Sequence, residues 1–472
     1  MNKRKEKLFL FFSDFISINL TWLVFYSIRV YSGWFDMLGE PAFWSPMLIV
    51  YIFWLSIYVF IGLYQPWFAR SRFDELSTLF KVTFYGVIIL FFLIFFDDNS
   101  SEPNSKAYPI NRSLILIYWG LLYGFSSIGR LFIRFIQRYL LIKGFGRKNT
   151  LIMGTGKQAK DIYIEIKDHR GLGLDIIGFV DLEEKESEIK EIKDLPILGN
   201  LSNFDNLVQD NQVKEIIFAL ENHQNDMLID IISKCENYNL ELKIVPNLYE
   251  ILSGQARTMQ LYSVPLIDIN TQIMPVWEQK AKRIMDIIVA LMILAVSSPI
   301  VLAASIAIKI NSKGPIFYMQ ERCGLNGKLF RVVKFRSMYT DAETKTGPVW
   351  SQRNDPRVTS VGKFMRKVRI DEIPQMWNVL KGEMSLIGPR PERLFFVEKL
   401  SQEIPYYKRR LRVKPGVTGW AQVKHKYDEN VEDVKEKVKY DLFYIENMSL
   451  RMDMKILFRT VLVVLFGKGH YN

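Results

Sequence analysis

The sequence predicts a membrane protein that combines helical and α/β parts in three domains, residues 1–148, 149–275 and 276–472. Three observations predict this fold class. The first domain holds four apolar stretches, the second alternates strands and helices around a glycine loop, and the third is basic and opens with another apolar stretch. With 472 residues, 49% of them hydrophobic, the chain is too long for one domain and too apolar for an ordinary soluble protein.

Composition also excludes several classes of protein. Charged residues make up 24% of the chain, which rules out a bundle made only of membrane spans. Two cysteines, Cys235 and Cys323, and four histidines exclude a disulfide scaffold and a Cys/His zinc module, and favour a reducing compartment. The net charge of +12 is carried by the first and last thirds, whereas residues 149–275 are acidic. This pattern suits anionic lipid or phosphate and argues against a nucleic-acid partner.

The first domain is predicted to be a four-helix transmembrane bundle. Its apolar stretches have about the 20 residues that a helix needs to cross the hydrocarbon: Leu8–Tyr26, Ser45–Leu63, Leu79–Phe96 and Ser113–Ile133. Basic residues precede the first stretch, lie between the second and third stretches, and continue from the end of the fourth stretch, whereas the loop 97–106 is acidic. The positive-inside rule therefore places both ends of this domain in the cytoplasm.

The middle domain is predicted to be a Rossmann-like, doubly wound domain. Strand 149–153 runs into a Gly154-x-Gly156-x-x-Ala159 loop and a helix, and strand 175–180 ends at Asp181. Two further strands, 214–219 and 241–245, follow helical stretches. The loop could hold a nucleotide, with Asp181 on the ribose, or it could only pack the helix on the strand.

The third domain opens with an apolar segment, 277–310, that is predicted to be a re-entrant membrane helix over about residues 281–309. Lys282 and Arg283 precede it and further lysines follow it, so both ends prefer the inner face of the membrane. Pro299 removes a helix hydrogen bond, and the Ser297 or Ser298 hydroxyl could satisfy a freed carbonyl. We expect a helix–break–helix hairpin that enters and leaves by one leaflet; a fifth span is the alternative.

Cations and carboxylates follow in short motifs. On a strand predicted over 330–338, Lys334 and Arg336 share one face, which suits a diphosphate held beside a membrane or, alternatively, contact with lipid headgroups. The adjacent carboxylates of Asp371 and Glu372 point in different directions, so one can attack phosphorus while the other holds a metal. The basic run 366–369 is expected to keep both ionised.

Downstream, Arg390 lies between Pro389 and Pro391, a rigid presentation of a guanidinium that suits bidentate phosphate binding. The basic run 409–414, which contains Arg412, precedes a glycine loop from Gly416 to Val423. This loop could close over a nucleotide or sugar, or it could be a structural turn under an interfacial tryptophan. Residues 452–466 are predicted to form an interfacial helix.

Four segments of the third domain, in this order, resemble the bacterial sugar transferase family, the polyprenyl-phosphate sugar-1-phosphate transferases: KRIMDIIVALMILAVSSPI, ERCGLNGKLFRVVKFRSM, RIDEIPQMWNVLKGEMSLIGPRPE and RVKPGVTGWAQV. The resemblance implies a monotopic catalytic domain whose membrane helix is broken at Ser298-Pro299. It implies a ping-pong reaction with Asp371 as nucleophile, and Glu372 beside it in a Mg²⁺ site. The implied substrate-binding residues are Lys334, Arg336, Arg390, Pro391, Arg412 and Gly416.

The whole chain is similar to the large members that begin O-antigen, exopolysaccharide or S-layer glycan synthesis. These transfer a hexose-1-phosphate, usually of galactose or glucose, from a UDP-sugar to undecaprenyl phosphate and release UMP. The implied location is the bacterial inner (cytoplasmic) membrane, in the lipid bilayer, with the catalytic domain on the cytoplasmic face. Later glycan-assembly enzymes are expected partners, and the acidic middle domain could form a homodimer.

Two other functions are alternatives. A membrane-anchored, NAD-dependent nucleotide-sugar dehydratase needs a Tyr-x-x-x-Lys pair, and Tyr163 and Lys167 have that spacing. They lie too soon after the glycine loop to reach a nicotinamide. A non-catalytic scaffold of glycan assembly is the third interpretation.

Overall fold

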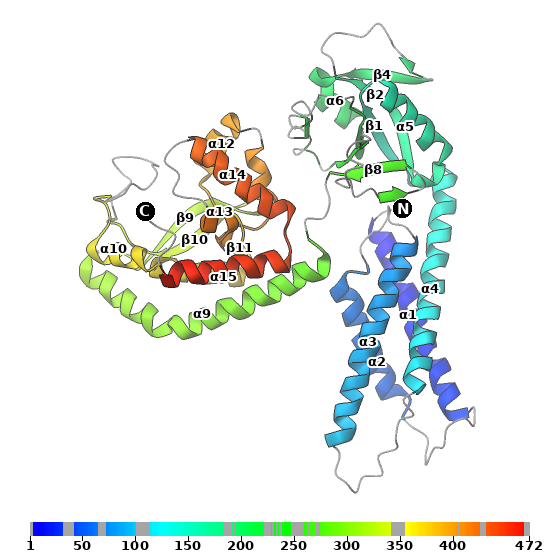
Figure 1. Cartoon of the computed structure of the whole chain (residues 1–472), viewed down its shortest axis with the longest axis horizontal. Helices are drawn as coiled ribbons and strands as arrows, with labels where there is room; N and C mark the ends of the chain where they lie inside the picture. The colour runs from blue at the N-terminus through cyan, green and yellow to red at the C-terminus, as the bar shows by residue number, and fades with distance from the viewer. Residues whose placement is uncertain are drawn as a thin grey trace. The chain divides into compact units, whose positions relative to one another are not determined.

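The chain is described from a computed structural model that covers most of its length (Figure 1). The described residues are 3–31, 42–64, 72–100, 113–182, 191–192, 194–220, 228, 231–232, 235, 238, 240–246, 259–261, 264–269, 274–340, 355–404, 406–424 and 431–466. They divide into two compact units, Met1–Thr271 and Gln272–Asn472. The finer division into three domains stays a prediction.

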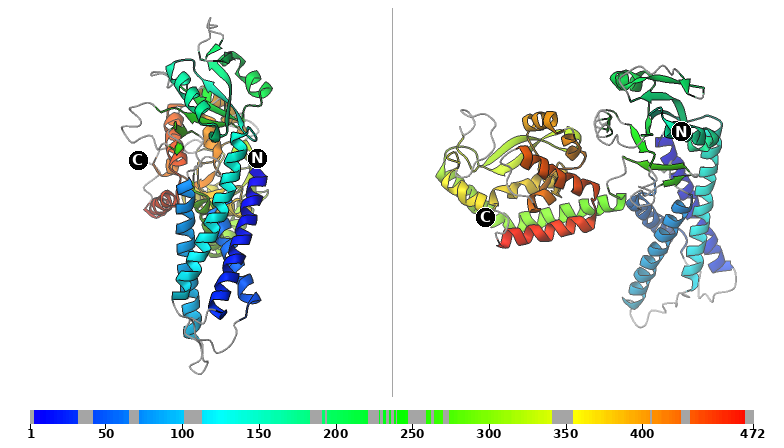
Figure 2. Two further views of the ribbon diagram at one scale, coloured as in Figure 1. Left: turned by 90° about the vertical axis from the view of Figure 1, so that its right-hand side faces the viewer. Right: turned by 45° about the horizontal axis from the view of Figure 1, so that its top comes forward.

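Four long apolar helices open the first unit and run side by side in both views (Figure 1, Figure 2). They are α1 (Lys3–Tyr31), α2 (Trp44–Ile61), α3 (Arg72–Ser100) and α4 (Ser113–Ile142). α2 ends earlier than its apolar stretch because Gly62 takes the left-handed conformation that closes a helix. Arg130 of α4 lies buried against Asp14 of α1, so the charge within the first apolar stretch faces a neighbouring helix.

A parallel-rich sheet follows in the same unit. Its strands are β1 (Lys148–Met153), β2 (Leu174–Asp181), β3 (Glu191–Ile192), β4 (Leu195–Asn200), β5 (Glu215–Phe218), β6 (Glu241–Ile244), β7 (Met259–Leu261) and β8 (Val264–Asp268). They lie in the order β3-β4-β2-β1-β5-β6-β8-β7, with β4, β2, β1, β5 and β6 parallel. The antiparallel strands β3, β7 and β8 lie toward the edges.

Helices cover both faces of this sheet, as the predicted doubly wound topology requires. α5 (Lys157–Asp168) packs on Ile152 and Ile217, whereas α6 (Phe204–Asp210) packs on Leu151 and Ile216. Neighbouring residues of one strand point to opposite faces, so the central strands need apolar residues on both sides, as at Leu151 and Ile152 of β1. Short 3₁₀ turns, η1 (Arg170–Leu172) and η2 (Leu201–Asn203), complete the connections. Gly154 must be glycine, because its φ is +115° and an added Cβ would lie 2.5 Å from the carbonyl oxygen of Ala219.

The second unit begins with α9 (Val276–Asn311), which is one continuous helix rather than the predicted helix–break–helix hairpin. Pro299 lies inside it, and Figure 1 shows the helix curved into an arc rather than folded into two antiparallel arms. The physical reason is local. Proline removes one backbone donor, and Ser298 Oγ donates to the carbonyl oxygen of Ala295, the acceptor that this proline leaves free, at 2.8 Å. The serine part of the prediction is therefore correct.

The rest of this unit wraps around α9 in short elements. They are β9 (Phe317–Cys323), η3 (Leu325–Gly327), β10 (Leu329–Phe335), α10 (Ser360–Lys367), η4 (Ile370–Gln375), α11 (Met376–Lys381), β11 (Ser385–Ile387), α12 (Leu394–Glu403), η5 (Tyr407–Arg412), β12 (Gly416–Thr418), α13 (Trp420–Lys424), α14 (Val431–Glu446) and α15 (Leu450–Phe466). β9 and β10 form the predicted antiparallel hairpin, and β11 and β12 pair in parallel. The core joins Ala290 of α9 to Val379, Ile387 and Ile456.

Candidate active site

The two adjacent carboxylates lie on η4, a 3₁₀ turn that leads into α11. Arg369, which precedes this turn, has a left-handed backbone with φ of 57°, so the chain turns sharply just before Asp371. Pro374 lies inside this turn, and its ring fixes the backbone φ at about −65°, which limits the backbone just after the carboxylates. The carboxylates are therefore presented by a short, rigid segment rather than by a loop.

Glu372 binds two cations from distant segments. Lys334 Nζ, on β10, donates to its Oε1 at 3.1 Å, and Arg390 Nη2, after β11, donates to the same oxygen at 2.6 Å. The side chain of Glu372 is only 14% exposed. Three predicted site residues thus meet at one carboxylate oxygen, and Asp371, itself buried, is the residue immediately before Glu372.

The two carboxyl groups differ strongly in acidity. Burial, followed by the neighbouring charge of Glu372, raises the pKa of Asp371 to about 6, although Lys334, Arg366 and Arg390 oppose this. Burial would also raise the pKa of Glu372, but Arg390 and Lys334 hold it well below its usual range. The sequence predicts that the run 366–369 keeps both groups ionised. For Glu372 the cations that matter come from β10 and the 389–391 segment, because they touch it directly.

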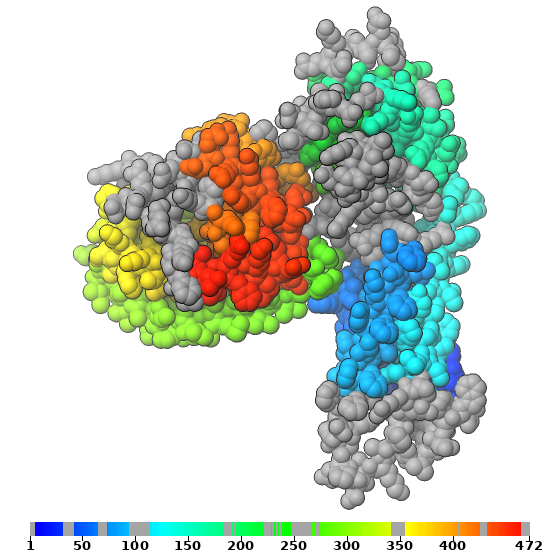
Figure 3. Space-filling view, viewed as in Figure 1, coloured from blue at the N-terminus to red at the C-terminus, as the bar shows by residue number. Residues whose placement is uncertain are grey.

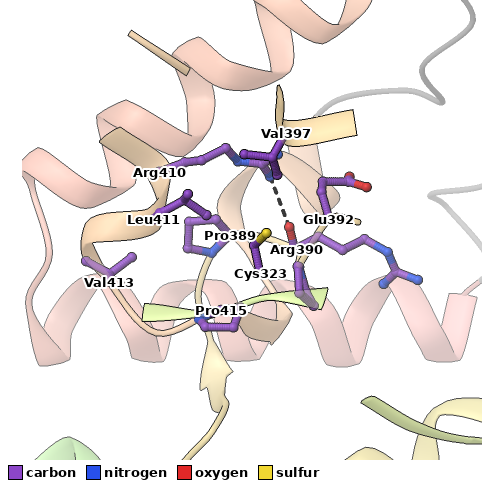
Figure 4. Close-up of a pocket in the computed structure, with 11 residues that line it drawn as sticks. Cys323, Pro389, Arg390, Glu392, Val397, Arg410, Leu411, Val413 and Pro415 are labelled. Atoms are coloured by element: carbon purple, nitrogen blue, oxygen red, sulfur yellow. Dashed lines mark hydrogen bonds between the residues drawn. The ribbon is translucent and has the colours of Figure 1, made fainter. Parts of the chain in front are cut away.

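Arg390 is held through its backbone. Its carbonyl oxygen accepts from Arg410 Nη2 at 3.0 Å, while its guanidinium points away from the small cavity beneath it (Figure 4). Arg410 is itself buried between Asp441 and Tyr407. The carbonyl oxygens of Pro389 and Pro391 accept from Gly416 N and Arg322 Nη1. The segment predicted to be rigid is thus fixed at each of its three carbonyls.

Arg336 lies elsewhere, contrary to the prediction that it shares a face with Lys334. β10 ends at Phe335, so the alternation of side chains stops before Arg336. Its buried guanidinium donates to the carbonyl oxygens of Ser312 and Lys313, where α9 ends. Arg336 therefore caps the helix C-terminus, a favourable place for a cation.

The basic residues that open α9 also contact the active-site segments. Lys282 Nζ is buried and donates to Asp453 Oδ2 at 2.7 Å and to the carbonyl oxygen of Ile387 at 3.0 Å. Arg283 donates to the carbonyl oxygens of Val379 and Leu380, where α11 ends. These two residues therefore brace the segments that carry Arg390 and Asp371.

The remaining predicted residues have different surroundings. Arg412 is the last residue of η5 and is partly buried, and none of the contacts described here joins it to Glu372. Gly416 pairs with Ser385, and an added Cβ there would lie 2.1 Å from the backbone nitrogen of Gly388. In the first unit, Tyr163 is buried against Phe179, which does not suit a catalytic tyrosine.

Sequence analysis missed Asn378. This buried residue of α11 accepts from Val333 N at 3.0 Å and donates to the carbonyl oxygen of Arg331 at 2.8 Å. It thereby joins the helix after η4 to the strand that carries Lys334. An amide within the otherwise apolar run 376–380 was the available signal.

The two adjacent carboxylates, Asp371 and Glu372, are the predicted ligands of a divalent metal. Among the described residues there is no group of three His, Cys, Asp or Glu side chains that could hold an ion. Mg²⁺ binds through one or two carboxylates and completes its shell with water and substrate phosphates. One Glu372 oxygen receives both cations, and Asp371 is buried beside it, so the donor set fits Mg²⁺ bound together with a substrate.

Comparison with known proteins identifies the family. The profile described as bacterial sugar transferase matches residues 277–467, and one described as a CoA-binding domain matches residues 60–246. A UDP-glucose:undecaprenyl-phosphate glucose-1-phosphate transferase of Klebsiella pneumoniae is 31% identical over 363 residues, 76% of this chain and 77% of that protein. The chain belongs to the bacterial sugar transferase family.

Two further relatives of this bacterial sugar transferase differ in their named sugars. An undecaprenyl-phosphate galactose phosphotransferase of Salmonella typhimurium is 31% identical over 75% of this chain and 76% of that protein. A UDP-N-acetylgalactosamine-undecaprenyl-phosphate N-acetylgalactosaminephosphotransferase of Aeromonas hydrophila is 40% identical over 238 residues. That alignment spans 50% of this chain and 55% of the Aeromonas protein.

Proposed function

We propose that this bacterial sugar transferase moves a hexose-1-phosphate from a UDP-sugar to undecaprenyl phosphate and releases UMP. The observation that carries the proposal is the meeting of Lys334 and Arg390 on Glu372, beside a buried Asp371 with its raised pKa. Such a group of two cations and two carboxylates suits the charge of a diphosphate under attack. The names of the relatives support the substrates.

The reaction would proceed in two displacements. The Asp371 carboxylate attacks the phosphorus that bears the sugar, the P–O bond to UMP breaks, and UMP leaves with that oxygen. A phosphate oxygen of undecaprenyl phosphate then attacks the same phosphorus, and the bond to Asp371 breaks. The products are the undecaprenyl diphosphate sugar and a free carboxylate, so no oxidant or further reactant is needed.

The residues around Asp371 would hold the phosphates in place. Lys334 and Arg390 can each turn a donor toward a phosphate oxygen while Glu372 keeps them in position. Mg²⁺, held by Asp371 and Glu372, would neutralise phosphate charge when it is bound. Arg412, Pro391 and Gly416 remain expected substrate-binding residues. Arg336 would act indirectly, because its guanidinium already binds the end of α9.

The proposed location is the cytoplasmic face of the bacterial inner membrane. The helices α1–α4 would cross the bilayer as a four-helix bundle, and α9 would enter and leave by the cytoplasmic leaflet. By length and composition all five helices could cross a membrane. The arc of α9, which contains Pro299, and the basic residues at both of its ends support the re-entrant path. Contacts with later glycan-assembly enzymes and a homodimer are part of the same expectation.

The proposal is tested by Asp371→Asn in the full chain. The variant should fold but give no UMP release and no covalent sugar-phosphate adduct when it is incubated with donor alone. Glu398→Gln, which removes an exposed carboxylate on α12, is the control and should keep both. Turnover of Asp371→Asn at the normal rate, or sequential rather than ping-pong kinetics, would refute the mechanism.

The sugar is to be found by a donor screen. Galactose and glucose are the proposed sugars, and the Aeromonas relative adds N-acetylgalactosamine to the test. UMP release would be followed with one sugar nucleotide at a time. Failure with every UDP-sugar, in a protein that is folded, would refute the proposed donor class.

A further inference from the structure

Three cations converge on one tryptophan ring outside the active site. The ring of Trp420, which opens α13, is buried, and three cationic groups lie over it. Lys424 Nζ is 5.4 Å from the ring centroid, Lys455 Nζ is 5.5 Å from it, and the guanidinium carbon of Arg459 is 5.1 Å from it. Lys424 belongs to α13, and the other two belong to α15. We call these four residues the Trp420 cluster.

The charge of this cluster is not balanced within the part of the chain that the structure describes. None of its three cations forms an ion pair with a described carboxylate. Asp453, the acid of α15, is fully buried and paired with Lys282. Each cation lies within 5.5 Å of the ring centroid, so any two of them are at most about 11 Å apart. Lys455 and Arg459 are four residues apart on α15, so they are neighbours on the helix surface, and like charges at this spacing repel. The quadrupole of one indole compensates only part of that repulsion.

An exposed apolar stripe runs along α15 next to these cations. Met454, Phe458, Val461 and Leu462 are all exposed, and their spacing puts them on one face of the helix. Lys455 and Arg459 follow Met454 and Phe458 directly, so they lie at the border of that stripe. An interfacial helix has this arrangement, with apolar side chains among acyl chains and cations at the level of the phosphates.

The neighbouring helix extends the apolar surface. α9 and α15 lie side by side (Figure 1, Figure 3), and Leu450 N, at the start of α15, donates to Glu278 of α9. α9 also exposes large apolar side chains, among them Ile288 and Leu291. A free phosphate or nucleotide would use the cations but not this apolar surface, whereas a phospholipid uses both.

We propose that the Trp420 cluster binds the phosphate of an anionic phospholipid headgroup, with the lipid chains against the apolar stripe of α15. The cluster would fix the depth and orientation of the catalytic unit on the membrane. This inference is separate from the transfer reaction and does not depend on Asp371.

The test measures lipid binding by the full chain in detergent, without donor or acceptor. Phosphatidylglycerol is titrated, phosphatidylcholine serves as the neutral lipid, and bound lipids are counted by native mass spectrometry. The triple variant Lys424→Gln, Lys455→Gln, Arg459→Gln should lose the tightest phosphatidylglycerol site. A basic residue near an anionic surface strengthens binding by roughly fivefold, so three should account for about a hundredfold in affinity.

A second triple variant is the matched control. Lys328→Gln, Lys399→Gln and Lys439→Gln remove the same charge from exposed, scattered positions of the same unit. This control should bind phosphatidylglycerol as the unchanged protein does, and both variants should melt at the same temperature. Equal weakening in both variants, or in neither, would overturn the proposal. Displacement of the lipid by inorganic phosphate at comparable concentration would overturn the choice of a lipid.

Discussion

Removing the charge of Lys282 should destabilise the catalytic unit and weaken its activity together. Lys282 Nζ is buried and binds Asp453 Oδ2 at 2.7 Å and the carbonyl oxygen of Ile387 at 3.0 Å. Lys282→Met keeps the apolar stem but leaves Asp453 with Tyr444 as its remaining hydrogen-bond donor in the described contacts. Loss of one partner from a buried ion pair costs about 3–5 kcal/mol, because the other charge stays buried without compensation.

That cost can be converted into a melting shift. For a unit of this size, 1 kcal/mol corresponds to about 2–4 °C, so the expected fall in melting temperature is about 6–20 °C. It would be measured by intrinsic fluorescence of the full chain in detergent. Below the melting temperature, activity should still be reduced, since the strand that Lys282 holds leads within three residues to Arg390.

A double variant separates the ion pair from simple loss of packing. Lys282→Met with Asp453→Leu removes both charges, so no charge is left buried alone, and most of the lost melting temperature should return. Lys309→Met, at an exposed position of the same helix, is the single-residue control and should melt normally. If Lys282→Met melts within about 2 °C of the unchanged protein, the pair contributes less than about 1 kcal/mol and the reasoning is wrong.

Three further outcomes follow from the site. Because the pKa of Asp371 is raised to about 6, adduct formation should fall about tenfold for each pH unit below 6, whereas an ordinary aspartate would stay ionised to about pH 4. Gly416→Ala should lower the free energy of unfolding by about 3 kcal/mol, because its Cβ would lie 2.1 Å from the backbone nitrogen of Gly388. Chemical denaturation would measure this, and normal stability would contradict it. Asn378→Leu should leave Val333 N without its hydrogen-bond acceptor, which should lower the free energy of unfolding by about 1–3 kcal/mol. It should also lower the rate of the first displacement, since the strand that Asn378 holds carries Lys334; an unchanged rate would count against that link.

Much of the fold follows from local patterns. The apolar stretches became helices α1–α4, and the alternation around Gly154 became a parallel-rich sheet with a helix on each face. The short antiparallel strands β7 and β8 were not predicted; β8 joins the sheet by pairing with β6, which lies about twenty residues earlier in the chain, and β7 pairs only with β8. The predicted break at Pro299 is absent for a local reason: Ser298 donates to the carbonyl oxygen that the proline leaves free, and the helix continues.

The site was predictable as motifs but not as contacts. Lys334 and Arg390 are 38 and 18 residues from Glu372, and only the folded chain shows that both donate to one of its oxygens. Periodicity failed at Arg336 because the strand ends one residue earlier. Arg410 looked like one of several similar cations, yet it is the one that holds the Arg390 carbonyl.

The polar residues of α9 have a common explanation. A lysine and an aspartate are costly in a helix otherwise suited to lipid. Lys282 binds the carbonyl oxygen of Ile387, and Asp286 Oδ1 accepts from Leu386 N, so both hold the short strand β11. At its other end α9 receives Arg336, which follows the strand that carries Lys334. The helix proposed to enter the membrane is therefore also the element that sets the spacing of the cations around Glu372. A change that straightens α9 should accordingly act on the active site without touching any residue in it.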